Sequence, residues 1–275
     1  MRMIGSGMLS TEQMLDMPLG GMSKEKQLPH WCGNIIYWIV HVLLKILYRY
    51  KVEGLQTLRS FKGKGGVVVV ANHKSFFDVA FMWCSARLSQ WIRFMARDTF
   101  YGKAGGLLGQ IFARCGAFPV TRDSADRTSV KRAAKHLKNG EIVGIYPEGT
   151  RRGKGNVDLS LHAGVALIAR MGHAPMLPST AVNVEKIKQK GKLPRFPKVI
   201  VRYGEPVYIE QFDFLPKTER LEGAAWYVMR ECFALDYGCP ADQVDMVALF
   251  PDTKDYADVF AEHPLVPMDA QSPTE

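Results

Sequence analysis

The pattern of apolar and polar positions divides the chain, from about residue 52 onward, into strand-like runs and amphipathic segments. The run Val67–Val70 is typical of a buried strand, and residues 141–146 (EIVGIY) indicate a second one. Further strands are expected at 175–184 and 198–203, and helices at 75–88, 125–138, 160–171 and 218–237. Strands that alternate with helices favour a single α/β domain, with a mixed sheet flanked by helices.

Residues 34–50 (NIIYWIVHVLLKILYRY) are the part of the chain best suited to lipid. On a helix they form two faces, a polar stripe of Asn34, His41, Lys45 and Tyr48 and an apolar face of Ile35, Trp38, Ile39, Val42 and Ile46. Aromatic residues and basic flanks are the usual anchors at a membrane interface. The short length and the internal lysine favour a helix over 31–51 that lies in the interface rather than spanning the membrane. A core helix packed on the domain is the alternative.

Composition narrows the class of protein. The 275 residues are 47% hydrophobic and 23% charged, which excludes a wholly disordered chain. The lack of an uninterrupted apolar run of about 18 residues excludes a polytopic membrane protein. Residues 240–275 carry eight acidic side chains against one lysine, so the rest of the chain must hold +16 to give the total of +9. A body this basic indicates an anionic partner: nucleic acid, an anionic membrane or a phosphorylated substrate.

The same features predict four segments along the chain. Residues 1–30 are expected to be a mobile extension, because six of the thirteen methionines lie among small and polar residues there. The interfacial helix follows at 31–51, and the α/β domain covers 52–240. Residues 241–275 are predicted to be an acidic C-terminal tail. The five cysteines are odd in number and lack CxxC spacing, so neither a disulfide framework nor a zinc site is expected.

The segment Asn72-His73-Lys74-Ser75-Phe76-Phe77-Asp78 carries the clearest chemical signature. His73 directly follows the buried strand, and Asp78 lies in the first turn of the next helix, with Ser75 as the expected N-cap. Such a turn lets the carboxylate bind one ring nitrogen of the histidine, and the other nitrogen is then free to act as a general base. His136 and Glu141 share the spacing, but they lie at a basic helix end where solvated surface is expected.

Three further blocks accompany this segment: residues 116–122 (GAFPVTR), 146–151 (YPEGTR) and 175–178 (PMLP). With them, the sequence resembles the glycerolipid acyltransferase family, whose members carry four such blocks in this order. The resemblance covers roughly residues 50–210, and within the family it is greatest to the bacterial 1-acyl-sn-glycerol-3-phosphate acyltransferases. Tyr146 stands where the family usually has phenylalanine, and Arg97 where many members have lysine.

The resemblance implies a role for each block. His73 deprotonates the acceptor hydroxyl, which attacks an acyl thioester, and Asp78 orients His73. The acceptor is bound by residues of the other blocks and by neighbours of the pair, namely Asn72, Arg97, Arg122, Glu148, Gly149, Thr150 and Arg151. Arg122 and Arg151 are fixed cations suited to bidentate phosphate binding. Neither a metal nor a bound cofactor is implied, since acyl-CoA or acyl-acyl carrier protein serves as co-substrate.

These observations favour an enzyme that transfers a fatty acyl chain to lysophosphatidic acid, giving phosphatidic acid at the cytoplasmic face of the cell membrane. An acyltransferase for glycerol 3-phosphate or another lysophospholipid is a second hypothesis, and a catalytically silent peripheral lipid-binding protein is a third. Nucleic-acid binding explains the charge equally well. The aromatic residues are not interleaved with basic ones, however, and the sequence contains no nucleic-acid-binding motif, so no nucleic-acid partner is expected.

Overall fold

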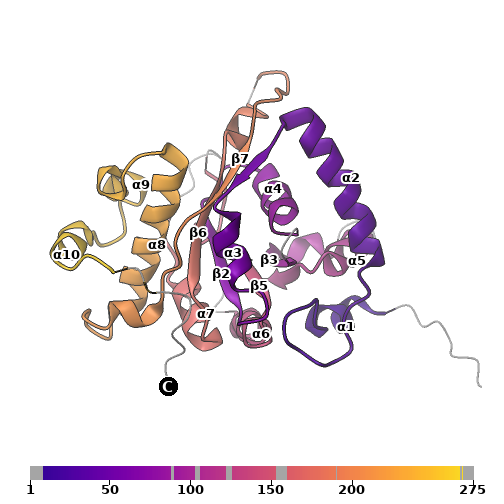
Figure 1. Ribbon diagram of the computed structural model, residues 1–275, viewed down its shortest axis with the longest axis horizontal. Helices are drawn as coiled ribbons and strands as arrows, with labels where there is room; N and C mark the ends of the chain where they lie inside the picture. The colour runs from indigo at the N-terminus through magenta and orange to yellow at the C-terminus, as the bar shows by residue number, and fades with distance from the viewer. Residues whose placement is uncertain are drawn as a thin grey trace, which may run out of the picture.

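The computed structural model of the chain describes residues 9–87, 90–102, 106–121, 126–152, 160–189, 191–266 and 268. One seven-stranded sheet runs through the molecule in the order β1-β7-β6-β2-β5-β3-β4 (Figure 1). Its strands are β1 (Lys51–Glu53), β2 (Val67–Ala71), β3 (Ile92–Arg97), β4 (Phe118–Val120), β5 (Ile142–Ile145), β6 (Met176–Val182) and β7 (Ile200–Tyr203). A mixed α/β sheet flanked by helices is confirmed.

Helices cover both faces of this sheet. They are α1 (Thr11–Asp16), α2 (Trp31–Tyr48), α3 (Leu55–Ser60), α4 (Phe77–Ala86), α5 (Leu107–Arg114), α6 (Arg127–Lys138), α7 (Gly164–Gly172), α8 (Arg220–Tyr237), α9 (Met246–Leu249) and α10 (Ala257–Glu262). On one face α7 packs between α6 and α8, and on the other α3 and α4 lie against the sheet with α2 outside α4 (Figure 1). Because both faces are covered, the central strand β2 is an unbroken apolar run in which Val67–Val70 are buried.

Strand direction brings the sequence motifs to one edge of the sheet. The strands β2, β3, β4, β5 and β6 are parallel, whereas β7 is antiparallel to β6 and parallel to β1. The residues after the carboxyl ends of β2 and β5 are therefore neighbours, with the end of β3 beside β5 and the loop after β6 beside β2. This carboxyl edge is where ligands bind in open α/β sheets.

The long helix α2 has its polar stripe turned toward the protein. Asn34 accepts a hydrogen bond from Nη2 of Arg87 at 2.7 Å, and His41 Nδ1 lies 2.7 Å from the hydroxyl of Tyr50. The ammonium group of Lys45 donates to the carbonyl oxygen of Tyr50 at 2.8 Å. The helix is thus not a core helix, and its polar stripe makes hydrogen bonds to the rest of the protein.

The opposite face of α2 is apolar and exposed. Its large side chains in contact with solvent are Trp31, Ile35, Trp38, Ile39, Val42, Leu43, Ile46 and Leu47. Among the described residues, α2 is the one helix long and apolar enough to cross a membrane, with 18 residues and a mean hydropathy of 1.4. A contiguous apolar face of this size on the outside of a protein marks an interaction surface.

The expectation of a mobile extension at 1–30 is wrong for the residues that the structure describes from 9 onward. Met14, Leu15, Leu19 and Leu28 are buried in the core. The guanidinium of the fully buried Arg93 holds the carbonyl oxygen of Met17. Segment 9–30 thus belongs to the folded body, and the first eight residues lie outside the described part of the chain.

A buried ionic cluster explains why this segment folds. Arg93 pairs with the carboxylate of Glu141, whose other oxygen lies 3.8 Å from Nδ1 of His136. On its other side, His136 Nε2 is 3.1 Å from the carbonyl oxygen of Leu15. We expected His136 and Glu141 to be solvated, and that is wrong because both are buried here. Arg93 and His136 bind main-chain oxygens of segment 9–30. The side-chain composition of that segment therefore gave no sign that it is held in the fold.

The chain beyond residue 240 also belongs to the fold. The segment 241–266 forms α9 and α10 and packs Phe250, Tyr256 and Phe260 into the core beside α8. Aromatic burial of this kind outweighs the acidic composition that indicated a tail. The domain boundary expected at 240 is therefore replaced by one no earlier than 266. Residues 267 and 269–275 lie outside the described part.

Candidate active site

His73 and Asp78 form a hydrogen-bonded pair at the carboxyl edge of the sheet. His73 lies just after β2, and its Nδ1 is 2.9 Å from Oδ2 of Asp78 in the first turn of α4. The same oxygen accepts the backbone N–H groups of Lys74 and Ser75, each at 2.7 Å. The Asp78 carboxylate is buried and held by three donors, so it fixes both the turn and the tautomer of His73. Nε2 is then the nitrogen free to accept a proton.

The local sequence explains this turn. Ser75 was expected to be the N-cap, which is wrong by one residue, because α4 begins at Phe77 and its N-cap is Phe76. The hydroxyl oxygen of Ser75 still accepts the backbone N–H of Phe77 at 3.3 Å. Oδ2 of Asp78, in the first turn of the helix, accepts the backbone N–H of Ser75. The carboxylate that holds the start of α4 is therefore the one that orients the histidine.

Tyr146 packs directly on the imidazole of His73. The two rings stack with their centroids 4.3 Å apart and an angle of 26° between their planes, and Phe94 stacks on the tyrosine at 5.8 Å. The hydroxyl of Tyr146 is buried and has no hydrogen-bond partner among the described residues. Burial raises the pKa of Tyr146 well above its ordinary value, so the ring stays neutral. Tyr146 thus acts on His73 through its ring face.

The side chain of Glu148 binds the backbone of His73. Its Oε2 accepts the backbone N–H of His73 at 2.8 Å, and its Oε1 accepts Nε of Arg152 at 2.5 Å. The backbone N–H of Arg152 in turn donates to the carbonyl oxygen of His73 at 2.9 Å. Burial raises the pKa of Glu148, although the neighbouring Arg152 and the His73 N–H oppose that effect. Glu148 was expected to bind the acceptor, but its side chain is fully buried and both oxygens are occupied.

Arg152 connects Glu148 to the C-terminal segment of the chain. Its guanidinium lies 4.8 Å from the ring centre of Phe233 and 4.7 Å from that of Phe250, and Nη2 donates to the carbonyl oxygen of Leu249 at 3.3 Å. Of the two adjacent arginines, Arg151 was the predicted site residue and Arg152 was not. The adjacent arginine was visible, but its aromatic partners are 80 or more residues away along the chain.

Asn72 is held in a second network and is buried rather than open to a substrate. Its side-chain oxygen accepts the hydroxyl of Thr180 at 2.8 Å, and its side-chain nitrogen donates to Asp236 at 2.9 Å. Asp236, near the end of α8, also pairs with the ammonium group of Lys74. The residues on both sides of His73 are therefore fixed by one carboxylate, which sequence analysis did not find.

The other predicted residues lie around this centre. The guanidinium of Arg151 stacks 4.4 Å from the ring centre of Phe76, in the turn that carries His73. Gly149 takes a positive φ of 61°, which lets the chain turn between Glu148 and Thr150. Arg97 ends β3 at the same edge of the sheet. Arg122 lies outside the described residues.

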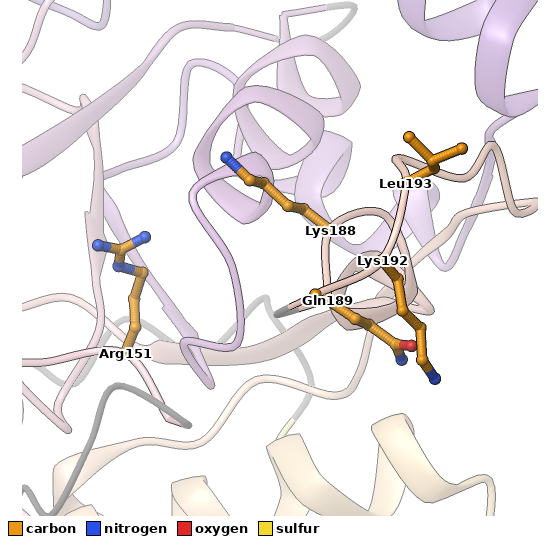
Figure 2. A pocket seen from close by; sticks show the side chains of 6 residues that line it. Arg151, Lys188, Gln189, Lys192 and Leu193 are labelled. Carbon is orange, nitrogen blue, oxygen red and sulfur yellow. The ribbon is translucent and has the colours of Figure 1, made fainter.

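Arg151 also lines a surface pocket of about 750 Å³, whose other walls come from the loop after β6 (Figure 2). That loop contributes Lys188, Gln189, Gly191, Lys192 and Leu193. The pocket is rich in cations, which suits an anionic group. Within the described ranges, no three histidine, cysteine or carboxylate side chains lie close enough together to hold a metal ion.

The arrangement supports proton transfer from a substrate hydroxyl. One nitrogen of His73 is fixed by a carboxylate, its backbone is held on both sides, and its ring is clamped by an aromatic stack. A base positioned in this way can activate a hydroxyl without a serine or cysteine nucleophile on the protein.

Comparisons with known proteins agree with this geometry. The model of the Acyltransferase family matches residues 49–182. A 1-acyl-sn-glycerol-3-phosphate acyltransferase of Bacillus subtilis (strain 168) is 31% identical over 190 residues, which cover 64% of this chain and 89% of the relative. A protein of the same name from Streptococcus pneumoniae (strain ATCC BAA-255 / R6) is 26% identical and covers 62% of this chain and 60% of its own.

A solved structure has the same fold. The 1-acyl-sn-glycerophosphate (LPA) acyltransferase PlsC from Thermotoga maritima superposes with a TM-score of 0.54 at 22% identity, over 74% of this chain and 80% of that one. The four sequence blocks, the matching family model and the Bacillus relative agree with one another. The chain therefore belongs to the glycerolipid acyltransferase family and is an acyltransferase.

Proposed function

We propose that this acyltransferase transfers a fatty acyl group from acyl-CoA or acyl-acyl carrier protein to the sn-2 hydroxyl of 1-acyl-sn-glycerol 3-phosphate (lysophosphatidic acid), forming phosphatidic acid. The observation that carries the proposal is the His73–Asp78 pair, with 2.9 Å between Nδ1 and Oδ2. The names of the Bacillus and Streptococcus relatives support the acceptor.

The reaction balances with His73 as the only proton carrier. Nε2 takes the proton of the acceptor hydroxyl while the oxygen forms a bond to the thioester carbonyl carbon. The tetrahedral intermediate collapses by breaking the carbon–sulfur bond, and the imidazolium returns its proton to the departing thiolate. Asp78 stabilises the imidazolium during this interval and holds its ring in place. The products are the ester and the free thiol.

The phosphate of the acceptor is bound by the cations at the edge of the sheet. Arg151 lies over the Phe76 ring, within the turn that carries His73. Its guanidinium offers a planar pair of donors that matches two phosphate oxygens. Arg97 and Arg122 complete the proposed set. Asn72 and Glu148 act as positioning residues, since both side chains are buried beneath the turn.

The acceptor is a membrane lipid in this proposal, and α2 holds the enzyme at the bilayer. Its apolar face, with Trp38 and Ile46 among the most exposed side chains, lies in the lipid interface while its polar stripe binds the protein. Basic residues flank it, with Arg49 and Lys51 after its end. Negative lipids attract such flanks at the cytoplasmic leaflet, which supports monotopic association with that face.

The test is acyl transfer by the detergent-purified full chain with labelled acyl-CoA or acyl-acyl carrier protein. Lysophosphatidic acid, glycerol 3-phosphate and lysophosphatidylcholine are offered separately. Phosphatidic acid formed from the first acceptor alone supports the proposal, and the donor with the higher kcat/KM is the assigned one. Product from glycerol 3-phosphate or from the choline lipid instead would replace the acceptor. No product with any combination would favour a silent lipid-binding protein.

A further inference from the structure

The loop between β6 and β7, residues 183–198, projects from the edge of the sheet that carries His73. Its base is held in place, because the side-chain nitrogen of Asn183 donates to the carbonyl oxygen of Lys198 at 2.9 Å. The backbone N–H of Arg195 donates to the carbonyl oxygen of Ile187 at 2.9 Å, and Ile187 is buried. The base of the loop is therefore fixed to the body of the protein, and Figure 1 shows the loop at the top of the molecule beside the end of α2.

The tip combines exposed apolar side chains with unpaired cations. Leu193 is 86% exposed and Phe196 51% exposed. Around them stand four exposed basic residues that form no ion pair within the described ranges, namely Lys188, Lys192, Arg195 and Lys198. The only carboxylate in the loop, Glu185, lies 3.5 Å from Lys74 and does not neutralise the tip. Exposed leucine and phenylalanine flanked by lysine and arginine are the composition of a membrane-interface element.

The loop contacts the C-terminal end of α2. Nη2 of Arg49, just after that helix, donates to the carbonyl oxygen of Phe196 at 2.8 Å. The ring of Phe196 lies 5.6 Å from that of Tyr48, the last residue of α2. The loop thus lies against the C-terminal end of the helix that carries the exposed apolar face, so a bilayer that meets this end of α2 also meets the loop.

The pocket at the side of the loop faces the catalytic turn. Figure 2 shows the Lys188 side chain extending toward Arg151, while Gln189 and Lys192 point away from it and Leu193 points outward. Two cations that face each other across a pocket repel unless an anion lies between them. A lipid phosphate at the membrane surface has the charge required, and Arg151 already stacks on Phe76 beside His73.

We propose that the loop 183–198 is a second membrane-docking element, which binds an anionic lipid bilayer beside α2. Leu193 and Phe196 insert among the headgroups, and the basic side chains contact lipid phosphates. The bilayer surface is thereby held at the pocket between Lys188 and Arg151, through which an acceptor lipid reaches His73. This inference rests on the proposed function, in which the acceptor is a membrane lipid and α2 lies at the interface.

The test measures binding of the full-length protein to vesicles. Wild type and L193D/F196D are floated with vesicles of phosphatidylcholine alone and with vesicles that contain phosphatidylglycerol. The matched control is V247D/V266D, which places two aspartates at exposed apolar positions of the C-terminal segment, away from the loop. We expect the loop variant to bind phosphatidylglycerol vesicles at least about tenfold more weakly than wild type, and the control to change by less than about twofold.

A second variant, K192Q/R195Q, tests the charges. It is expected to weaken binding to phosphatidylglycerol vesicles and to leave binding to pure phosphatidylcholine unchanged, because screened attraction to anionic lipid is what it removes. Unchanged vesicle binding by both loop variants would overturn the inference, and so would an equal loss in the control. Normal vesicle binding with a raised KM for acyl-acyl carrier protein alone would assign the loop to a protein partner instead.

The outcome is separate from that of the proposed reaction. Thermal unfolding of each variant reports whether the fold is retained. Turnover by the wild type of a short-chain acceptor below its critical micelle concentration tests the chemistry without a bilayer. If wild type fails to turn over that acceptor, the proposed function is overturned while the vesicle comparison still decides the docking role of the loop.

Discussion

The carboxylate of Glu148 accepts the backbone N–H of His73 at 2.8 Å, so the one acidic residue of the YPEGTR block supports His73 from within the protein. The kinetic effect of a mutation distinguishes this arrangement from a direct contact between Glu148 and the substrate. A group that holds the base affects the chemical step, whereas a group that holds the acceptor affects its binding.

Glu148→Gln tests this relationship. Glutamine replaces one of the two carboxylate oxygens with an NH2 group, which then faces a donor, either the His73 N–H or Nε of Arg152. The turn that carries His73 therefore loses part of its support. We expect kcat to fall about tenfold to a hundredfold, which is the usual cost of a small misplacement, with little change in the acceptor KM. Steady-state kinetics with lysophosphatidic acid measure both values. A raised KM at unchanged kcat would return Glu148 to the acceptor site.

Tyr146→Phe tests which part of the tyrosine matters. Its hydroxyl is buried and unpaired among the described residues, and an unpaired buried polar group costs about 1–3 kcal/mol. We expect the phenylalanine variant to be as stable as wild type or more so, with kcat within about twofold. Tyr146→Leu, which removes the stack on His73, should lower kcat instead. A large loss of activity in the phenylalanine variant would give the hydroxyl a role in the reaction.

The buried His136 predicts a loss of stability in mild acid. Burial lowers its pKa below the ordinary 6.5, the positive charge of Arg93 acts in the same direction, and Glu141 opposes both. Below pH 6.5 His136 is therefore protonated in the unfolded chain, whereas in the folded chain it stays neutral until the pH falls to the lowered pKa. The free energy of unfolding should fall by at most about 1.4 kcal/mol per pH unit between 6.5 and the lowered pKa.

Denaturant unfolding at pH 7.5 and 5.5 measures this effect in wild type and in His136→Gln. The glutamine can still donate to the carbonyl oxygen of Leu15 but does not titrate, so its stability should change less between the two pH values. An equal change in the free energy of unfolding between pH 7.5 and 5.5 in the two proteins would mean that His136 is not the group responsible.

We expect the exposed face of α2 to contact the membrane. Ile39→Asp combined with Val42→Asp places two charges on that face, at side chains that are 57% and 46% exposed. The variant should leave phosphatidylglycerol vesicles while its unfolding midpoint stays near that of wild type. Normal sedimentation with vesicles would show that this face does not contact lipid, and a collapsed midpoint would show that it packs in the core.

The sequence was sufficient for the centre of the site because the signal there is local. The strand Val67–Val70, the turn with His73 and the helix with Asp78 lie within a dozen residues, so strand burial and helix capping fix their relative positions. For α2, periodicity identified two faces, but the polar stripe could have pointed either way. Its direction depends on Tyr50 and Arg87, which lie beyond the helix.

The parts that were missed depend on contacts between distant residues. Asp236 reaches Asn72 across 164 positions, and Arg152 reaches the carbonyl oxygen of Leu249 across 97. The N-terminal segment is fixed by main-chain oxygens bound to Arg93 and His136, which no side-chain pattern reveals. The YPEGTR motif drew attention to Glu148, but it carried no sign that the side chain points inward, against the backbone of His73.

The most direct test of the central claim is the rate of phosphatidic acid formation by His73→Ala, measured with labelled acyl-CoA and lysophosphatidic acid. Circular dichroism and vesicle binding serve as controls for folding and docking. If His73 is the general base, the rate should fall by about a hundredfold to ten-thousandfold or more while both controls remain at the wild-type level. A variant that is folded, bound to vesicles and still as active as wild type would contradict the account.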